Sequence, residues 1–148
     1  MPNRLSDMPR FISWSESYDT PLSEDDYITE CVSPIQSVAV ASLLFPQFVS
    51  VKGGVFLAHR FTIENFNEWW NHFEGDIQQI EKMINHVHLW DLFPTATGSE
   101  GTESAELTAL GEWMVMSWAI AVESAYPGRL FSVTLDDDYG PTVTLHSR

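Results

Sequence analysis

Basic residues and cysteine are scarce in this 148-residue chain, and each shortage excludes a class of protein. Only seven residues are lysine or arginine against 21 aspartates and glutamates, so the formal net charge is -14 at pH 7. A protein that binds nucleic acid through its phosphates needs clustered Lys and Arg side chains. Here the seven basic residues are scattered along the sequence. We therefore expect no nucleic acid among the partners.

Cys31 is the only cysteine, which rules out an intramolecular disulfide and a zinc site built from several cysteines. The longest apolar stretches, 38–45 and 113–122, are far shorter than the roughly 20 residues of a membrane-spanning helix. The first ten residues contain charges and two prolines where a secretory signal peptide has an apolar segment. We therefore expect a cytoplasmic protein with no membrane association.

Motifs that would name a reaction are also missing. No P-loop or dinucleotide-binding glycine fingerprint occurs, and no serine stands in a G-x-S-x-G context. Cys31 lies in an acidic segment, which disfavours its thiolate form. The sequence therefore predicts no catalytic residue and no cofactor, and it favours a non-enzymatic protein.

The chain does contain enough apolar material for one core, because 44% of its residues are hydrophobic and 13% are aromatic. A domain of this length can bury about 70% of its extended surface. Residues 1–33 combine seven acids with several large aromatic side chains. We expect them to form a partly ordered N-terminal arm, with a short strand over 11–14 as one option, before a single domain of residues 34–148.

Three helices are predicted in that domain. Ser33 is a suitable N-cap for a helix over 34–45 that begins with proline. Apolar residues spaced alternately three and four apart predict one long amphipathic helix over 63–87, with Gly75 as its only weak point. A third helix over 104–125 is apolar on most sides, which predicts burial on most sides.

Two β-hairpins complete the predicted fold. The runs 48–51 and 55–59 flank Lys52-Gly53-Gly54, whose glycines suit the positive φ values of a tight turn. The runs 131–135 and 142–146 alternate with a period of two. The expected fold class is α+β, with about three helices packed on one face of a roughly four-stranded antiparallel sheet made of the two hairpins.

His86 and His88 are weak candidates for a metal site. On a strand they would share a face and could bind one ion through their imidazole nitrogens. If the helix continues through Val87, however, residues two apart point about 200° apart and cannot meet on one ion. The periodicity favours the helix, so we predict no metal site. Together with Glu81 and Asp91, these histidines define an alternative function, a small enzyme or a domain that binds a metal or ligand in a pocket.

Two further patterns leave alternatives open. The run Asp136-Asp137-Asp138 offers clustered carboxylates of the kind that calcium binds, but it lacks the rest of a calcium loop and suits a turn capped by aspartates. Trp69 stands beside the apolar stripe of the long helix, where it either widens the buried face or anchors a partner.

The acidic surface suggests the main functional hypothesis, a non-enzymatic protein-binding module for a basic partner such as a nuclease or a nucleic-acid-binding protein. In size, charge and solubility the chain resembles immunity proteins of bacterial toxin pairs and DNA mimics. The acids gather in the arm and on the long helix. The predicted partner-binding residues are Glu24, Asp25, Asp26, Glu64, Glu68, Trp69 and Asp76.

Two other readings of the same features remain open. The acids could form only a solubilising shell, because many soluble proteins are acidic. The long helix could instead form the seam of a homodimeric accessory subunit.

Overall fold

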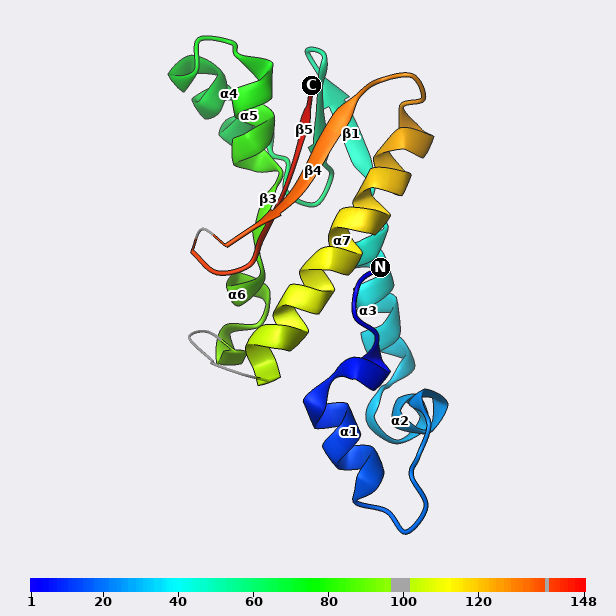
Figure 1. The fold of residues 1–148 in the computed structure, drawn as a ribbon. Coiled ribbons are helices and arrows are strands. Elements are labelled where there is room, and N and C mark those ends of the chain that lie inside the picture. Colours follow the sequence, from blue (N-terminus) through cyan, green and yellow to red (C-terminus); the bar gives the residue numbers. More distant parts are fainter. Residues whose placement is uncertain (97–101, 138) are drawn as a thin grey trace.

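Seven α-helices and two small antiparallel β-sheets are found in the computed structural model, which describes residues 1–96, 102–137 and 139–148. The expected α+β class is therefore confirmed. The molecule is elongated, with the sheets and the helices α4 (Ile63–His72) and α5 (Ile77–Ile84) at one end and the first helices at the other (Figure 1). Helix α7 (Thr102–Ala125) runs along the length between them.

The N-terminal lobe, residues 1–31, is helical throughout its regular parts. A 3₁₀ turn, η1 (Leu5–Asp7), precedes helices α1 (Pro9–Glu16) and α2 (Glu24–Cys31). The short strand considered for residues 11–14 is therefore wrong. Pro9 begins α1 at a position where its missing N–H has no helical partner to lose. The rings of Phe11, Trp14 and Tyr27 then pack together, and Ala109 of α7 closes this small core.

The predicted helix after residue 33 is confirmed as α3 (Pro34–Leu44). The Ser33 side chain accepts a hydrogen bond from the Gln36 backbone N–H, and the Gln36 side-chain oxygen accepts one from the Ser33 backbone N–H, which forms a capping box. The third helix is also confirmed, as α7. The two helices are joined by buried Trp118, whose indole N–H donates to the Leu43 carbonyl at 2.9 Å.

The first hairpin is confirmed and consists of β1 (Phe48–Val51) and β2 (Gly54–Leu57). Its two turn residues, Lys52 and Gly53, have φ values of 50° and 82°. Positive φ at both central positions matches the right-handed twist of the flanking strands. The turn therefore fixes the register, in which Val51 pairs with Gly54.

The single long helix expected over 63–87 is wrong. Helix α4 ends at His72, because Glu74 and Gly75 adopt left-handed φ values of 52° and 81°. The Asp76 side chain then caps α5 by accepting from the Gln79 backbone at 3.3 Å. The apolar stripe spans the break because both helices cover one small core, which is built from the following residues: Phe56, Phe66, Ile80 and Ile84.

The second hairpin is confirmed as β4 (Phe131–Asp136) and β5 (Thr142–Ser147), and it gains a third strand, β3 (His86–His88). The strand order is β3-β5-β4. One face packs on α7 through Val87, Val143 and Leu145, all of them buried. The opposite face is polar. In the sequence, α6 (Leu89–Leu92) and the 3₁₀ turn η2 (Pro94–Ala96) lie between β3 and α7, and residues 97–101 are outside the described residues.

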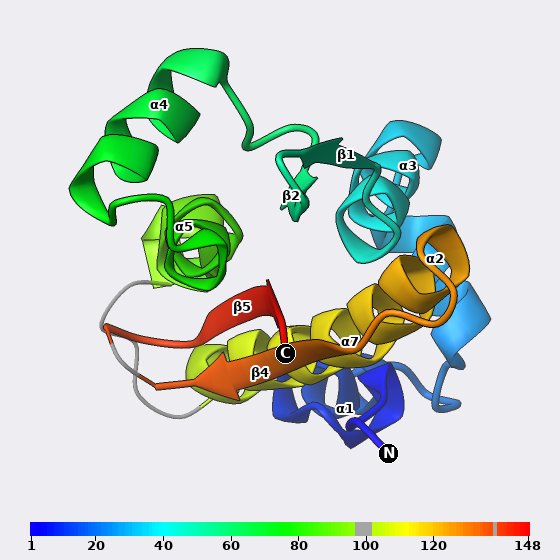
Figure 2. The same cartoon turned by 90° about the horizontal axis from the view of Figure 1, so that it is seen from above.

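The two hairpins do not join into the predicted four-stranded sheet, because side chains of α5 lie between them. Glu81 is fully buried and accepts from the backbone N–H of Val55 in β2 at 2.9 Å and of Ser147 in β5 at 2.7 Å. Asn85, also fully buried, accepts from the Leu57 N–H and donates to the carbonyls of Val55 and Leu145. Buried strand edges must be hydrogen-bonded. Here the side chains of Glu81 in α5 and of Asn85 at its C-cap satisfy them in place of direct strand pairing. Figure 2 shows helix α5 lying beside both β2 and β5.

Candidate functional site

Helix α3 exposes an apolar surface that no described part of the chain covers. Ile35 is 74% exposed, Val38 59% and Phe45 58%, and only the last turn of the helix contacts the main core. We call Ile35, Val38 and Phe45 the α3 patch. Single exposed apolar residues are ordinary, whereas a cluster on one helix is typical of an interaction surface.

A hollow of about 900 Å³ opens beside the α3 patch. Helix α3 forms one wall through Ala39 and Leu43, the chain after β2 contributes His59, and the end of α6 contributes Leu92 and Phe93. Apolar side chains predominate in this lining. A partner's aromatic or aliphatic side chain would lose its contact with water there, which is how anchor residues contribute to binding.

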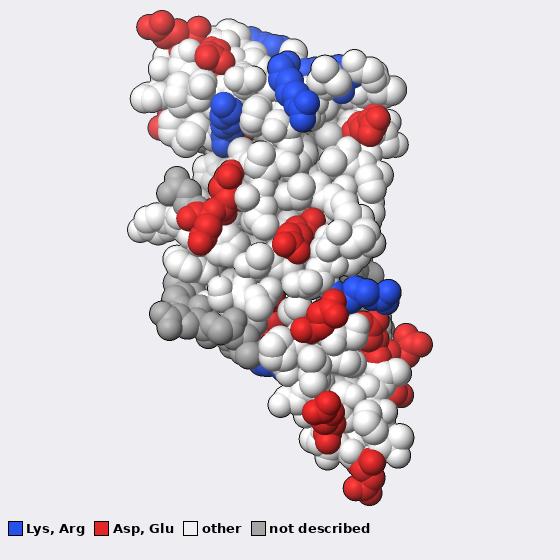
Figure 3. All heavy atoms as spheres, in the orientation of Figure 1, with Lys and Arg blue, Asp and Glu red and all other residues white. Residues whose placement is uncertain are grey.

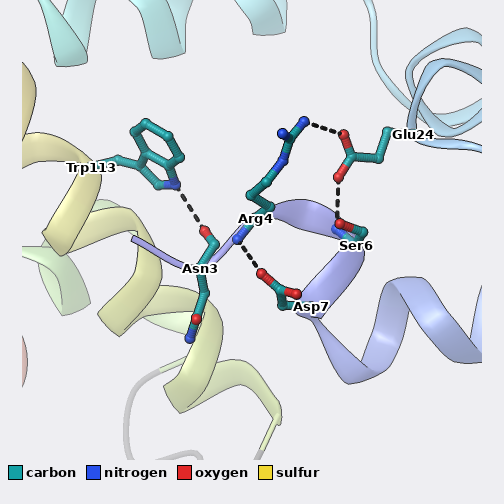
Figure 4. A network of polar contacts seen from close by, with 6 residues as sticks. All are labelled: Asn3, Arg4, Ser6, Asp7, Glu24 and Trp113. Atoms are coloured by element: carbon teal, nitrogen blue, oxygen red, sulfur yellow. Dashed lines mark hydrogen bonds and ion pairs between the residues drawn. The ribbon is translucent and has the colours of Figure 1, made fainter. Parts of the chain in front are cut away.

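The predicted acidic residues Glu24, Asp25 and Asp26 form the first turn of α2. Glu24 holds the lobe together, since it accepts from the Ser6 backbone at 2.9 Å and pairs with Arg4 at 3.1 Å (Figure 4). These contacts, led by the bond from the Ser6 backbone, lower the pKa of Glu24. Hydrogen bonds from Ser23, at the N-cap of α2, likewise lower the pKa of Asp26. Both carboxylates are thus held in the charged form.

The lobe is also attached to the body by hydrogen bonds. Trp113 of α7 donates its indole N–H to the Asn3 carbonyl at 2.9 Å (Figure 4), and Arg10 of α1 pairs with Glu106 of α7 at 2.6 Å. Asp25 and Glu30 remain exposed on α2. The lobe therefore presents fixed negative charge on the helix that directly precedes α3.

The other predicted partner-binding residues lie at the opposite end of the molecule (Figure 1). Glu64 and Glu68 are exposed on α4, whereas Asp76 caps α5. Trp69 is half-buried, with its ring stacked on Phe73 at 5.6 Å between centroids. The structure therefore does not bring the two predicted acidic surfaces together, and they cannot contact one small partner as a continuous face.

The charge is also unevenly distributed over the surface. On the face drawn in Figure 3, most basic side chains lie at the end that carries α4 and α5, where acidic ones lie beside them, and acidic side chains also extend over the middle and the N-terminal lobe. At the basic end, Arg129 donates to the carbonyl of Gly53 in the β1–β2 turn, next to Lys52. The lobe's Arg4 and Arg10 instead pair with Glu24 and Glu106. Near the β1–β2 turn, basic side chains therefore offset part of the negative charge on this face.

His86 and His88 lie on strand β3 rather than on a helix. The helical geometry that would have kept their side chains apart, on which we predicted no metal site, is therefore wrong. Their side chains share the polar face of the sheet, and their ring centroids are 4.9 Å apart. A hollow of about 610 Å³ lies over this face. It is lined by the following residues: Lys82, His86, His88, Thr134, Asp136, Thr142, Thr144 and His146. Among the described residues, no three His, Cys, Asp or Glu side chains are grouped closely enough to surround one ion.

The remaining candidates lie elsewhere. The Glu81 carboxylate points away from the histidines into the junction of the two sheets, and Asp91 is exposed on α6. Cys31 is exposed at the end of α2. Asp136 accepts from the Thr134 hydroxyl at 2.9 Å, whereas Asp138 of the possible calcium loop lies outside the described residues.

Sequence reasoning missed two features. His146 joins the polar face because β5 pairs with β3, which no local pattern indicated. The exposure of α3 was also missed, because its largely apolar composition indicates a preference for burial.

No single helix among the described residues is long and apolar enough to cross a membrane. Helices α2 and α3 meet that criterion only as a pair, across a bend of 115°.

No protein-family model, no curated protein and no solved structure matches this chain.

Proposed function

We propose that this chain is a non-enzymatic, acidic protein-binding module that binds a basic partner protein through the α3 patch and the adjacent N-terminal lobe. An immunity protein or inhibitor that blocks a nuclease or another nucleic-acid-binding protein is the type of function we infer. The observation that carries the proposal is the exposure of the α3 patch, where Ile35, Val38 and Phe45 are each more than half exposed.

The apolar surface supplies the affinity in this proposal. Burying apolar surface contributes roughly 25 cal/mol per Å², and the neighbouring hollow of about 900 Å³ offers room for an anchor side chain. Solvent exposure of such a surface is unfavourable for the free protein. A partner that covers α3 would remove that cost.

Charge indicates the nature of the partner. The exposed carboxylates of Asp25 and Glu30 lie on α2, directly before α3, and would attract a basic surface. A second copy of this chain would instead bring together two molecules of net charge -14. Anionic membrane surfaces would be repelled in the same way, because they attract basic rather than acidic segments. A basic protein with an apolar ridge satisfies both features.

The test begins with capture of partners from lysate of the source cells on immobilised wild-type protein, followed by recombinant production of each captured protein. Affinity is then measured for wild type and for the double variant Ile35→Ser/Val38→Ser. Ile63→Ser/Leu130→Ser is the matched control, because it removes two exposed apolar side chains far from α3. We expect the patch variant to weaken binding at least about tenfold and the control to change it little.

A second pair of variants tests the charge. Asp25→Lys/Glu30→Lys should weaken binding, and wild-type affinity should fall as salt rises from about 50 to 500 mM, because salt screens exposed charges. Glu64→Lys/Glu68→Lys changes the same charge on α4 and should have a smaller effect. The proposal is overturned if affinity is independent of salt, if the α4 variant has the larger effect, or if α3 instead mediates self-association or binding to lipid vesicles.

A further inference from the structure

Hydrogen bonds favour one tautomer for the histidines of the polar sheet face when their rings are neutral. The Nδ1 atoms of His86 and His146 lie 3.1 and 2.8 Å from the carbonyl oxygens of Lys82 and Ser147. A carbonyl oxygen can only accept, so each Nδ1 carries the hydrogen and donates it. The Nε2 atoms of the neutral rings then hold a free electron pair.

His88 reaches the same state through a side chain. Its Nδ1 lies 2.7 Å from the Thr142 hydroxyl oxygen, and that hydroxyl donates its own hydrogen to the Gly140 carbonyl at 3.1 Å. When the hydroxyl donates to Gly140, the Thr142 oxygen accepts from His88 and Nε2 again keeps its electron pair. Metal-binding histidines are typically oriented in this way, with the other ring nitrogen donating to a protein acceptor.

The distance between the two rings fits one shared ion. Two imidazoles that bind zinc tetrahedrally, with metal–nitrogen distances near 2.0–2.1 Å, have ring centres roughly 5 Å apart. The centroids of His86 and His88 are 4.9 Å apart, on side chains that β3 projects from the same face. We propose that His86 and His88 bind one zinc-like divalent transition-metal ion through their Nε2 atoms.

The site has two protein ligands from β3 and remains open. The described residues offer no group of three ligating side chains, so water or a donor from a bound molecule completes the coordination. His146 lies across the same hollow, and Asp136 provides a compensating negative charge. Lys82 also lines the hollow, and its positive charge repels a bound cation. An anion is a poorer ligand than a metal ion, because neutral Nε2 atoms cannot donate hydrogen bonds to it.

The experiment uses full-length protein without a histidine tag, freed of metal by a chelator. Zinc ion is titrated by calorimetry into wild type, His86→Gln, His88→Gln and the control His72→Gln, which removes an exposed histidine of α4. We expect about one zinc ion per chain, with affinity lowered at least about tenfold in either β3 variant and retained in the control. Thermal unfolding of each variant verifies that it is folded.

Nitrogen NMR of the histidine rings in the wild-type protein gives a second readout that does not depend on a variant. Zinc should shift the Nε2 resonances of His86 and His88 and leave their Nδ1 atoms protonated. Equal zinc affinity in all four proteins, or unchanged ring resonances at saturating zinc, overturns the proposal. A response of these resonances to inorganic phosphate instead of zinc would also overturn it. None of these outcomes bears on the α3 patch, so the two proposals fail independently.

Discussion

Replacing Asn85 by aspartate tests whether α5 holds the two sheets together. The substitution keeps the size of the side chain and the oxygen that accepts from the Leu57 N–H at 2.8 Å. It removes the two N–H groups that donate to Val55 at 2.7 Å and to Leu145 at 3.2 Å. In their place a carboxylate oxygen faces both carbonyl oxygens, so two attractive contacts become repulsive.

The expected loss of stability is large because Asn85 is fully buried. Each buried carbonyl left without a donor costs about 1–3 kcal/mol, which gives about 2–6 kcal/mol for the pair. Burial of an unpaired charge adds to this cost. Since a domain of this kind is stable by about 5–15 kcal/mol in total, Asn85→Asp should leave it close to unfolding at neutral pH.

Urea unfolding monitored by the fluorescence of the six tryptophans measures the change. The control is Asn67→Asp, which makes the same chemical change at an exposed position of α4. Burial raises the pKa of the introduced carboxyl in the folded state, so the penalty should be complete at neutral pH and shrink as the pH falls and the carboxyl becomes protonated. A destabilisation below about 1 kcal/mol, or one no larger than in the control, would refute the bridging role.

Two further predictions concern the attachment of α3 and of the N-terminal lobe. Trp118→Phe removes the N–H that donates to the Leu43 carbonyl and leaves a small cavity, so we expect a loss of about 2–4 kcal/mol in urea unfolding; an unchanged midpoint would contradict this. The lowered pKa of Glu24 predicts that its stabilising effect on the lobe is complete above its ordinary value of 4.5 and is lost as the pH falls through the lower folded-state pKa. The amide resonance of Ser6 should report this transition, and a Glu24→Gln variant that kept it would show that another group is responsible.

Local signals in the sequence were sufficient for several elements. Ser33 followed by proline marked the start of α3, and glycine between two β-rich runs marked the first hairpin. In the folded protein Ser33 forms the capping hydrogen bonds of α3, and Gly53 adopts a positive φ value in the hairpin turn. Such elements are predictable because their cause is contained in a few neighbouring residues.

Elements that depend on distant partners were not predictable in this way. Strand β3 is three residues long and exists because Val87 pairs with Val143 of β5. The apolar spacing through Gly75 suggested one helix, because α4 and α5 bury the same face despite the break. The exposure of α3 also depends on distant parts of the chain. Its apolar composition indicates a preference for burial, but it does not show whether the rest of the chain supplies a surface that covers the helix.

The contacts of Glu81 also bear on how the protein folds during synthesis. Its carboxylate joins Val55 of the first hairpin to Ser147 of β5, which follows it by 92 residues in the sequence. On a ribosome, the outer edge of β2 would emerge long before β5 exists to complete the junction, and an unpaired strand edge is prone to aggregate. Folding of the body should therefore finish only after β5 has left the exit tunnel, and chaperones would have an exposed hairpin edge to protect until then.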